Sequence, residues 1–488
     1  MDLPERAARH FGHSPALRTR ENTLSFEEYN NHSAKIANLL YRKGVRAGDI
    51  VALVSPNSPA MVTLLAGILK AGMIAAPLNN RFPETILKVT LDKLRPQLLL
   101  TDALQPFSLP GINTGTIHSV IDDAEGCPLE PEFELPDTMD RPASIIHTSA
   151  STGEAKAAVH TVANHWYSAL GSNENIPFGS GDCWLLSLPL YHIGGYAILI
   201  RSLISGGSVA VSPPDDTIEL SMQRFPVTHL SLVPTQLHRL LNDTGSTEKL
   251  RRLKAVLLGG SPAPKSLIDR AIRQNIPLYL SYGSTEMTTQ ISTSPAPISR
   301  LTQNSGTLLP YREIMAAENG ELLVKGPCLF QGYLSEGIIQ PQTDSDGWFH
   351  TSDIGHIDDD GSVTVLGRKD NMFISGGENI HPEEIEKALM MVEGIHSAVV
   401  VPVPDQEYGE RPAAFIQTGK ESVPDDEAIT QAMNATIGKL KSPVRYYRVS
   451  EWSTLPGSQK IDRALYRKRG EQHDKSRGSD ASYPAPPA

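Results

Sequence analysis

The chain has 488 residues, of which 40% are hydrophobic and 20% charged, and its formal net charge is −11. That length exceeds one ordinary hydrophobic core, so we expect at least two domains, and the acidic balance argues against a general nucleic-acid-binding protein. Three scattered cysteines suit a cytoplasmic protein without disulfides or a metal cluster, and we expect neither a signal peptide nor a membrane-spanning segment.

The first 300 residues alternate apolar strands with helices. Apolar runs predict the strands, and apolar residues at helical spacing, with Pro59 in one first turn, predict the helices. The predicted strands are Ile50–Val54, 98–100, 184–188 and 256–258, and the predicted helices are 58–71 and 267–274. This alternation favours an α/β fold whose large N-terminal domain contains mixed sheets.

From about residue 306 the pattern changes to short strands and turns. Residues 320–325 predict a strand, and the Asp-Asp-Asp-Gly run at 358–361 predicts a hairpin. Farther along, 382–391 predict a helix with an acidic first turn, and 398–403 predict a strand. We expect an N-terminal domain at 1–369, a small C-terminal α+β domain at 370–469 and a disordered, Pro-rich tail at 470–488.

The first motif is a loop at 148–156 that follows the apolar pair Ile145-Ile146. Hydroxyls and backbone N–H groups satisfy phosphate oxygens, and a lysine offsets their charge, so the loop predicts a triphosphate site. The residues concerned are Thr148, Ser149, Ser151, Thr152, Gly153 and Lys156. The Walker A pattern is absent, and a polar surface turn would have a similar composition.

The second motif runs from Ser281 to Glu286, after an apolar strand at 278–280. A strand that enters a glycine turn here presents the hydroxyl of Thr285 and the carboxylate of Glu286. Such a carboxylate can hold Mg²⁺, which keeps several waters and bridges to phosphate oxygens. The ring of Tyr282 could stack on a purine. A polar loop in which Thr285 caps a helix is the alternative.

The third motif places Asp353 directly after the hydroxyl pair Thr351-Ser352. A carboxylate can accept hydrogen bonds from both hydroxyls of a ribose diol. A cap or turn residue is the alternative.

The fourth motif, at 367–380, combines the charged run Arg368-Lys369-Asp370, an apolar strand and the pair Gly376-Gly377 before a helix. Glycines allow close approach of the backbone to a ligand or a positive φ, and a plain strand–turn–helix connection is the alternative.

The fifth motif is Lys460, on a Gly/Ser turn near the C-terminus. A lysine in such a place is usually only solvated, so by itself it carries little weight.

Taken together and in this order, the five motifs resemble those of the adenylate-forming superfamily, which includes acyl-CoA synthetases, nonribosomal-peptide adenylation domains and luciferases. The resemblance runs from about residue 10 to residue 469. It implies a large N-terminal domain and a small mobile C-terminal domain joined at a hinge, Asp370. It also implies two reactions: a carboxylate attacks the α-phosphate of ATP to give an acyl-adenylate and pyrophosphate, and the thiol of coenzyme A then displaces AMP.

The resemblance also assigns roles to residues. Ser149, Ser151, Thr152 and Lys156 would hold the β- and γ-phosphates, Thr148 and Gly153 would belong to the same nucleotide-binding loop, and Thr152 and Glu286 would lie near Mg²⁺. Thr285 would contact the α-phosphate, with Tyr282 and Gly283 beside the nucleotide, and Asp353 and Arg368 would hold the ribose. Lys460 would bridge the carboxylate and the α-phosphate, until domain rotation brings Gly376 and Gly377 to the pantetheine tunnel.

Three alanines depart from the family pattern of the phosphate loop. Ala150, Ala155 and Ala157 stand where the family usually has Gly, Pro and Gly. If the loop needs a positive φ at 150 or 157, an alanine there costs about 1–2 kcal/mol, so we expect weaker binding of ATP with the chemistry intact.

The acyl-binding side resembles one subfamily, the o-succinylbenzoate–CoA ligases of menaquinone synthesis. The similar stretches are 164–169, 189–195, 200–203, 284–290 and 374–386. The resemblance places His192 beside the acyl group and lets a flat ring lie against Gly259 and Gly260. Because that substrate has a second carboxylate, a cationic or hydroxyl partner is needed, and the candidates are Arg201, Ser284 and Thr289.

Two other functions stay open at this point. The Gly-Gly-Glu-Asn-Ile-His-Pro run at 376–382 is equally similar to 4-chlorobenzoate–CoA ligases, so a benzoate-type aryl-CoA ligase is one alternative. The altered phosphate loop could instead mark a homologue that binds nucleotide without turnover. Homodimers are common among similar enzymes.

Overall fold

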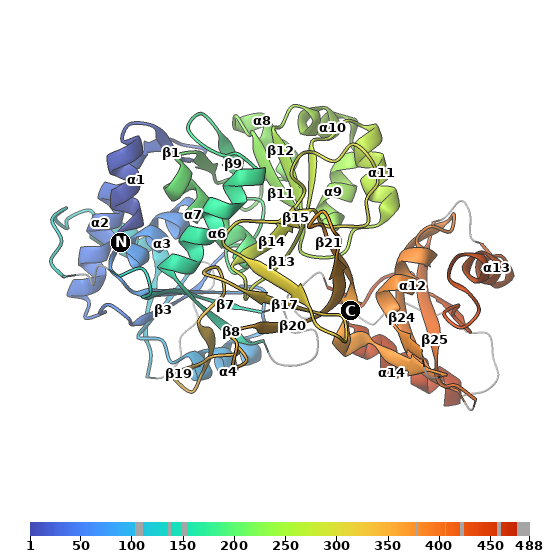
Figure 1. The fold of residues 1–488 in the computed structure, drawn as a ribbon. Helices are drawn as coiled ribbons and strands as arrows, with labels where there is room; N and C mark the ends of the chain where they lie inside the picture. The colour runs from blue at the N-terminus through green and yellow to red at the C-terminus, as the bar shows by residue number, and fades with distance from the viewer. Residues whose placement is uncertain are drawn as a thin grey trace.

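The computed structural model describes residues 1–102, 111–134, 138–148, 155–376, 378–405, 407–419, 424–455 and 460–475. These residues form a large N-terminal domain with mixed sheets and a small C-terminal domain, which appears in orange and red beside it in Figure 1. This confirms the predicted α/β fold class. Within the described residues, none of the helices combines the length and hydropathy needed to cross a membrane.

The first N-terminal sheet carries most of the predicted site. Its six central strands, from β1 to β13, are parallel, and antiparallel strands extend it at both edges. In spatial order the strands are β15 (Thr307–Leu308), β14 (Thr289–Thr293), β13 (Leu278–Ser284), β12 (Ala255–Leu258), β11 (His229–Leu232), β9 (Cys183–Leu185), β10 (Ser208–Ala210), β1 (Pro15–Arg18) and β2 (Thr23–Ser25).

The second N-terminal sheet has eight strands, and it places the two ends of the predicted phosphate loop on adjacent strands, β7 and β8. In spatial order its strands are β19 (Ile338–Gln340), β18 (Gly332–Ser335), β8 (Ala157–Thr161), β7 (Pro142–His147), β4 (Ile74–Leu78), β3 (Ile50–Val54), β5 (Leu98–Thr101) and β6 (Asn113–Thr116). A smaller sheet contains β16 (Glu313–Ala316), β17 (Glu321–Lys325), β20 (Phe349–Ile357) and β21 (Val363–Arg368).

Eleven helices of the described N-terminal residues pack against these sheets. They are α1 (Leu3–Phe11), α2 (Phe26–Arg42), α3 (Pro59–Lys70), α4 (Glu84–Leu94), α5 (Ile117–Ala124), α6 (Val162–Asn175), α7 (Ile193–Ser205), α8 (Ile218–Arg224), α9 (Pro234–Leu241), α10 (Thr244–Arg251) and α11 (Lys265–Arg273). The helix α3 is buried on all sides, as its nearly continuous apolar sequence requires, and Ser58 caps its first turn.

The C-terminal domain has its own sheet and its own hydrophobic core, because its two core clusters contain only residues from Phe373 onward. The sheet contains β23 (Glu378–Ile380), β22 (Phe373–Ser375), β25 (Gly409–Thr418), β24 (Ile395–Asp405) and β26 (Tyr446–Arg448). The helices are α12 (Pro382–Leu389), α13 (Asp426–Ile437) and α14 (Arg463–Lys475), and a 3-10 turn at Lys369–Asn371 joins the two domains. The domain limits at 369 and 469 stay predictions.

One predicted strand is too long. The strand predicted at 184–188 ends at Leu185. The N–H of Ser187 turns back to the carbonyl oxygen of Leu185 at 2.9 Å, and the hydroxyl of Ser187 bonds to the carbonyl of Ser231. Since Pro189 then lacks an N–H donor, the ladder cannot continue. The other predicted strands and helices exist within a few residues of their expected limits.

Two fully buried histidines in the N-terminal domain are held in the neutral form. His160 and His229 are 0% and 1% exposed. Burial lowers the pKa of each from its ordinary 6.5 to about 4. Between these two values the unfolded chain binds a proton that the folded chain does not, so folding stability falls as the pH drops.

We therefore predict that the unfolding free energy of the His160→Gln variant falls less on acidification than that of the wild type. Between pH 6 and pH 5 the wild type should lose about 1 kcal/mol more unfolding free energy than the variant, which has no group to protonate there. Urea unfolding at both pH values measures this. His118→Gln, at an exposed position on α5, is the matched control. Equal losses in wild type and His160→Gln would show that His160 does not titrate as described.

Candidate active site

The turn between β13 and β14 has a strained backbone. Thr288 and Thr289 have φ values of 52° and 105°, which are unusual for β-branched residues. Gly283 precedes the turn, and a Cβ on Gly283 would collide with the carbonyl oxygen of Thr289. The close approach of β14 therefore requires glycine at 283, independently of any role in nucleotide binding. The hydroxyl of Ser284 accepts the N–H of Met287 at 3.2 Å and closes the turn.

Contacts from three other segments hold this turn in place. The Nε2–H of His160 donates to the carbonyl oxygen of Thr285 at 2.7 Å, and the N–H of Phe330 donates to that of Glu286 at 2.8 Å. Ser168 donates its hydroxyl to the carbonyl of Thr288 at 2.5 Å. Because each donor comes from a different element, the positions of Thr285 and Glu286 are fixed by the fold around them.

The third motif lies beside this turn. Asp353 on β20 faces Arg368 on β21 in the strand register. The carboxylate accepts hydrogen bonds from the hydroxyl of Tyr282 at 2.7 Å and from Arg368 Nη1 at 3.1 Å. Burial raises the pKa of Asp353, and these two hydrogen bonds oppose that rise. The preceding Ser352 has a φ of 59°, a second strained position next to a predicted ligand-binding carboxylate.

A tyrosine, Tyr333, contacts both Glu286 and Lys156, the lysine at the end of the predicted phosphate loop. The hydroxyl of Tyr333 donates to Glu286 Oε1 at 2.6 Å, and Lys156 Nζ lies 5.0 Å from the centre of the Tyr333 ring. Thr148 and Lys156 close the base of the loop, with Thr148 N–H donating to the Lys156 carbonyl at 2.9 Å. Tyr333 is not predictable from the sequence, because a single tyrosine after Gly332 carries no signal of its own.

Four of the predicted loop residues cannot be placed. Ser149, Ser151, Thr152 and Gly153 lie outside the described residues, as does Ala150. Ala157 begins the regular strand β8 and does not have a positive φ. The strain expected for an alanine at 157 is therefore absent.

Lys460 reaches this site from the C-terminal domain. Burial and the charge of Arg368 lower the pKa of Lys460, whereas the charges of Glu286 and Asp353 act in the opposite direction. Lys460 also helps burial to lower the pKa of His192 to about 4. These mutual effects mean that charged side chains from four of the five motifs, with His192, lie close enough to influence one another.

His192 is the N-cap residue of α7, and its carbonyl accepts the N–H of Tyr196 at 3.1 Å. With a pKa of about 4, its imidazole is neutral near pH 7. Two glycines end β12: Gly260 has a φ of +83°, and a Cβ on Gly259 would meet no atom closer than 3.7 Å. A Cβ on Gly259 would therefore make only ordinary van der Waals contact, with Ser281.

Two buried arginines lie behind the strained turn. Arg201 is 4% exposed and donates through Nη2 to Gln290 Oε1 at 2.6 Å and to Thr289 Oγ1 at 3.5 Å. Arg312 is 5% exposed and donates to carbonyl oxygens of Gln290, Pro310 and Ser168. In the described part of the chain, every acceptor bonded to these two guanidiniums is neutral. Burial and the charge of Arg312 lower the pKa of Arg201 to about 9.

The predicted hinge and the second glycine motif lie at the domain junction. Asp370 accepts a hydrogen bond from Arg368 Nη2 at 2.9 Å, within the connecting turn. Gly376 has a φ of +56° and donates its N–H to the carbonyl of Tyr408 at 2.9 Å. Gly377 lies outside the described residues.

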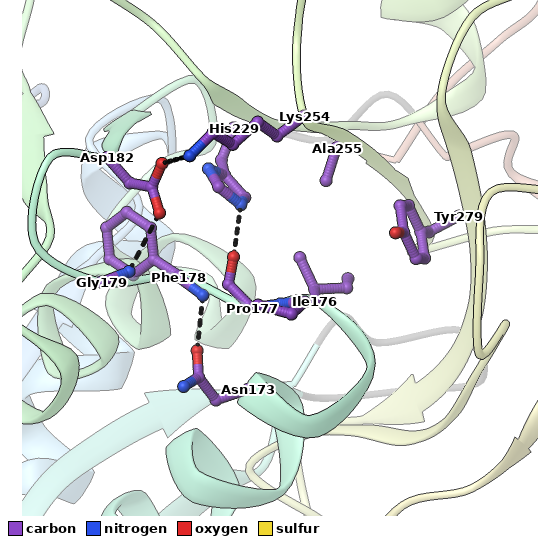
Figure 2. Close-up of a pocket in the computed structure, with 10 residues that line it drawn as sticks. All are labelled: Asn173, Ile176, Pro177, Phe178, Gly179, Asp182, His229, Lys254, Ala255 and Tyr279. Carbon is purple, nitrogen blue, oxygen red and sulfur yellow. Dashed lines mark hydrogen bonds and ion pairs between the residues drawn. The ribbon is translucent and has the colours of Figure 1, made fainter.

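A cavity of about 410 Å³ lies elsewhere in the N-terminal domain, and Figure 2 shows ten residues that line it. Its polar groups include an ion pair between Lys254 and Asp182 at 2.6 Å and a hydrogen bond from His229 to the carbonyl of Pro177 at 3.0 Å. Lys254, His229 and Tyr279 stand at the amino ends of β12, β11 and β13. The motif residues follow the carboxyl ends of these strands, where open α/β sheets bind ligands, so this cavity is a separate feature.

The described residues fit a magnesium ion that takes most of its ligands from phosphate and water. They contain no group of three or more His, Cys, Asp or Glu side chains that could hold a metal alone. Glu286 offers a hard carboxylate donor, and the hydrogen bond to Tyr333 engages only Oε1. Mg²⁺ is usually bound through one or two carboxylates together with substrate phosphates.

Comparisons with known proteins agree with this geometry. Residues 4–334 match the family described as AMP-binding enzyme, and residues 384–458 match the AMP-binding enzyme C-terminal domain. A 2-succinylbenzoate–CoA ligase of Bacillus cereus is 32% identical over 442 residues, which cover 88% of this chain and 90% of that protein.

Solved structures give the same result for the fold. The o-succinylbenzoate CoA synthetase MenE of Bacillus subtilis, in complex with the acyl-adenylate intermediate OSB-AMP, superposes with a TM-score of 0.84 at 28% identity, covering 96% of this chain and 98% of that one. The same enzyme in complex with ATP and magnesium ion also gives 0.84 at 28%, covering 95% and 98%.

Proposed function

The chain belongs to the AMP-binding enzyme family, and we propose that it is an ATP-dependent acid–CoA ligase that converts o-succinylbenzoate into o-succinylbenzoyl-CoA. One observation carries the proposal: Lys460 from the small domain lies near enough to Glu286 and Asp353 for their charges to act on its pKa. The names of the similar enzymes support the choice of acid. A cytoplasmic location and a homodimeric state belong to the proposal, and the three free, buried cysteines suit a reducing compartment.

In the first reaction two anions must meet. An oxygen of the substrate carboxylate attacks the α-phosphorus of ATP, the bond to the bridging oxygen breaks, and pyrophosphate leaves with its electron pair. The Lys460 ammonium would lie between carboxylate and α-phosphate, where it offsets their repulsion and the charge that develops on the phosphate oxygens. The hydroxyl of Thr285 would bond to the α-phosphate.

The nucleotide would be held by the other groups of the site. Asp353, oriented by Tyr282 and Arg368, would accept hydrogen bonds from the ribose hydroxyls. Lys156 would neutralise the terminal phosphates together with the loop from Thr148. A magnesium ion on Glu286 would supply positive charge that neutralises the phosphate oxygens and orients them.

In the second reaction the small domain would turn about Asp370. The sulfur of coenzyme A attacks the acyl carbon, the thiol loses its proton, and AMP leaves with the electrons of the broken mixed-anhydride bond. In the present orientation Lys387 of the small domain donates to the Val365 carbonyl of the large domain at 3.1 Å, and Asn371 of the connecting turn donates to Glu383 at 2.6 Å. Rotation would exchange such contacts for the approach of Gly376 and Gly377 to the site.

The two buried arginines favour a substrate with a second carboxylate. Charges that are removed from water without a counter-charge are unfavourable, and Arg201 and Arg312 have only neutral acceptors in the described part of the chain. Thr289, which Arg201 contacts, lies opposite Ser284 in the strand register. An anion bound beside this turn would balance the charges. A benzoate or 4-chlorobenzoate would leave them unbalanced, so the dicarboxylate is the better candidate.

The direct test is release of pyrophosphate from ATP in the presence of Mg²⁺, coenzyme A and one of several acids. We expect o-succinylbenzoate to support release with a kcat/KM at least about tenfold above that for benzoate or 4-chlorobenzoate, because only the dicarboxylate meets the buried cations. Turnover of the benzoates without o-succinylbenzoate would overturn the choice of acid. Absence of release with any aromatic acid would favour a homologue that binds nucleotide without turnover.

Arg201→Lys tests the second carboxylate. A lysine keeps the charge but loses the planar fork, so the KM for o-succinylbenzoate should rise about tenfold or more while the KM for ATP stays within about twofold. The control is Arg273→Lys, at an exposed position of α11. An equal rise in both KM values would indicate a general distortion and count against a role for Arg201 in acid selection.

Lys460→Ala should separate the two reactions. Formation of the acyl-adenylate should fall by about 100-fold or more, whereas thioester formation from preformed acyl-adenylate and coenzyme A should change little, because the lysine has left the site by then. Lys468→Ala, at an exposed position of α14, should leave both rates unchanged. Equal loss of both reactions would contradict the rotation of the small domain.

A further inference from the structure

Tyr333 joins two groups of the nucleotide site that come from different parts of the chain. It lies on β18, where it pairs with Ala158 of β8, the strand that follows Lys156. Its hydroxyl donates to Glu286 Oε1 at 2.6 Å, and the face of its ring lies 5.0 Å from Lys156 Nζ. One side chain therefore contacts both the predicted metal-binding carboxylate and the predicted phosphate-binding cation.

In its contact with Glu286 the hydroxyl of Tyr333 is the donor, because a carboxylate oxygen can only accept. A carboxylate that accepts a hydrogen bond through Oε1 keeps Oε2 free, and its plane is fixed. The ring, in turn, attracts the Lys156 ammonium through its electron-rich face.

The packing of Tyr333 does not itself require a hydroxyl. Its ring makes an edge contact with Phe330 at 4.9 Å between centroids, and Phe330 packs on Phe349 at 5.5 Å. A phenylalanine would preserve these contacts. The hydroxyl instead donates a hydrogen bond to Glu286. The backbone of Glu286 is already held, because its carbonyl oxygen accepts the N–H of Phe330. The extra hydrogen bond therefore determines where the carboxylate of Glu286 points.

We propose that Tyr333 is a positioning residue that couples the two halves of the magnesium–ATP site: its hydroxyl orients Glu286 toward the metal, and its ring orients Lys156 toward the phosphates. This inference rests on the proposed function, which assigns Glu286 and Lys156 to that site. It predicts that the two contacts can be removed one after the other, with different consequences for metal and nucleotide.

The experiment compares Tyr333→Phe and Tyr333→Leu with the wild type. Phenylalanine removes the hydroxyl and keeps the ring, whereas leucine removes both. Affinity for ATP is measured by calorimetry in the absence and presence of increasing Mg²⁺, with pyrophosphate release as a second readout and thermal melting as the check on folding. Tyr311→Phe is the matched control, because it removes a hydroxyl from a tyrosine that is 43% exposed.

For Tyr333→Phe we expect the Mg²⁺ concentration that gives half of the full increase in ATP affinity to rise about tenfold, with metal-free affinity within about twofold of wild type. For Tyr333→Leu we expect, in addition, a metal-free affinity for ATP about threefold weaker, because Lys156 loses the ring. Tyr311→Phe should match the wild type in both measurements.

Two results would overturn the inference. Wild-type Mg²⁺ dependence in a folded Tyr333→Phe variant would remove the link to Glu286, and equal metal-free affinities in the two variants would remove the link to Lys156. If Tyr333→Leu does not fold, Tyr333→Met serves as the second variant, since it also lacks an aromatic ring and should show the same weaker metal-free affinity. If the wild type itself neither binds magnesium–ATP nor releases pyrophosphate, the proposed function fails; if it does both, only the role of Tyr333 is in question.

Discussion

The rest of the site depends on the strained turn between β13 and β14. Thr288 and Thr289 adopt positive φ values, which cost about 1–2 kcal/mol for such residues. The turn persists because His160, Phe330 and Ser168 donate to three of its carbonyl oxygens. In return, Thr285 presents a hydroxyl and Glu286 a carboxylate, whose charge acts on Lys460 of the small domain. The surrounding hydrogen bonds thus offset the backbone strain, and the turn has the fixed geometry that a preorganised site requires.

The turn also separates two kinds of charge. On its outer side, Asp353 and Glu286 are oriented by the hydroxyls of Tyr282 and Tyr333, and the cations Lys156 and Lys460 complete a site suited to a metal–nucleotide complex. On its inner side, Arg201 and Arg312 are buried against neutral acceptors. Under the proposed function, an acid with two carboxylates would place one at each side, so the same turn would serve both adenylation and the choice of acid.

Much of this arrangement can be predicted from the sequence, for identifiable reasons. Apolar runs and caps locate strands such as Ile50–Val54 and helices such as Pro59–Lys70, because their signals are local. Asp353 and Glu286 become candidates through their hydroxyl and glycine neighbours, but only the resemblance of all five motifs in order assigns them roles. The roles of Tyr333, His160 and Arg312 are not predictable, because each depends on which strand lies beside which. The same holds for two local features. The strand predicted at 184–188 ends at Leu185, and Ala157 has ordinary strand geometry, because of contacts that no short stretch of sequence reveals.

The most direct test of the central claim is a crystal structure of the protein with a hydrolysis-resistant sulfamate analogue of o-succinylbenzoyl-adenylate. The account predicts that the sulfamate lies against Thr285 and Lys460, the ribose diol on Asp353, and the free carboxylate of the acyl group within hydrogen-bonding distance of Arg201 or a water bound to it. A nucleotide bound away from the turn, for example in the cavity beside His229 and Tyr279, or a free carboxylate directed to solvent, would contradict it.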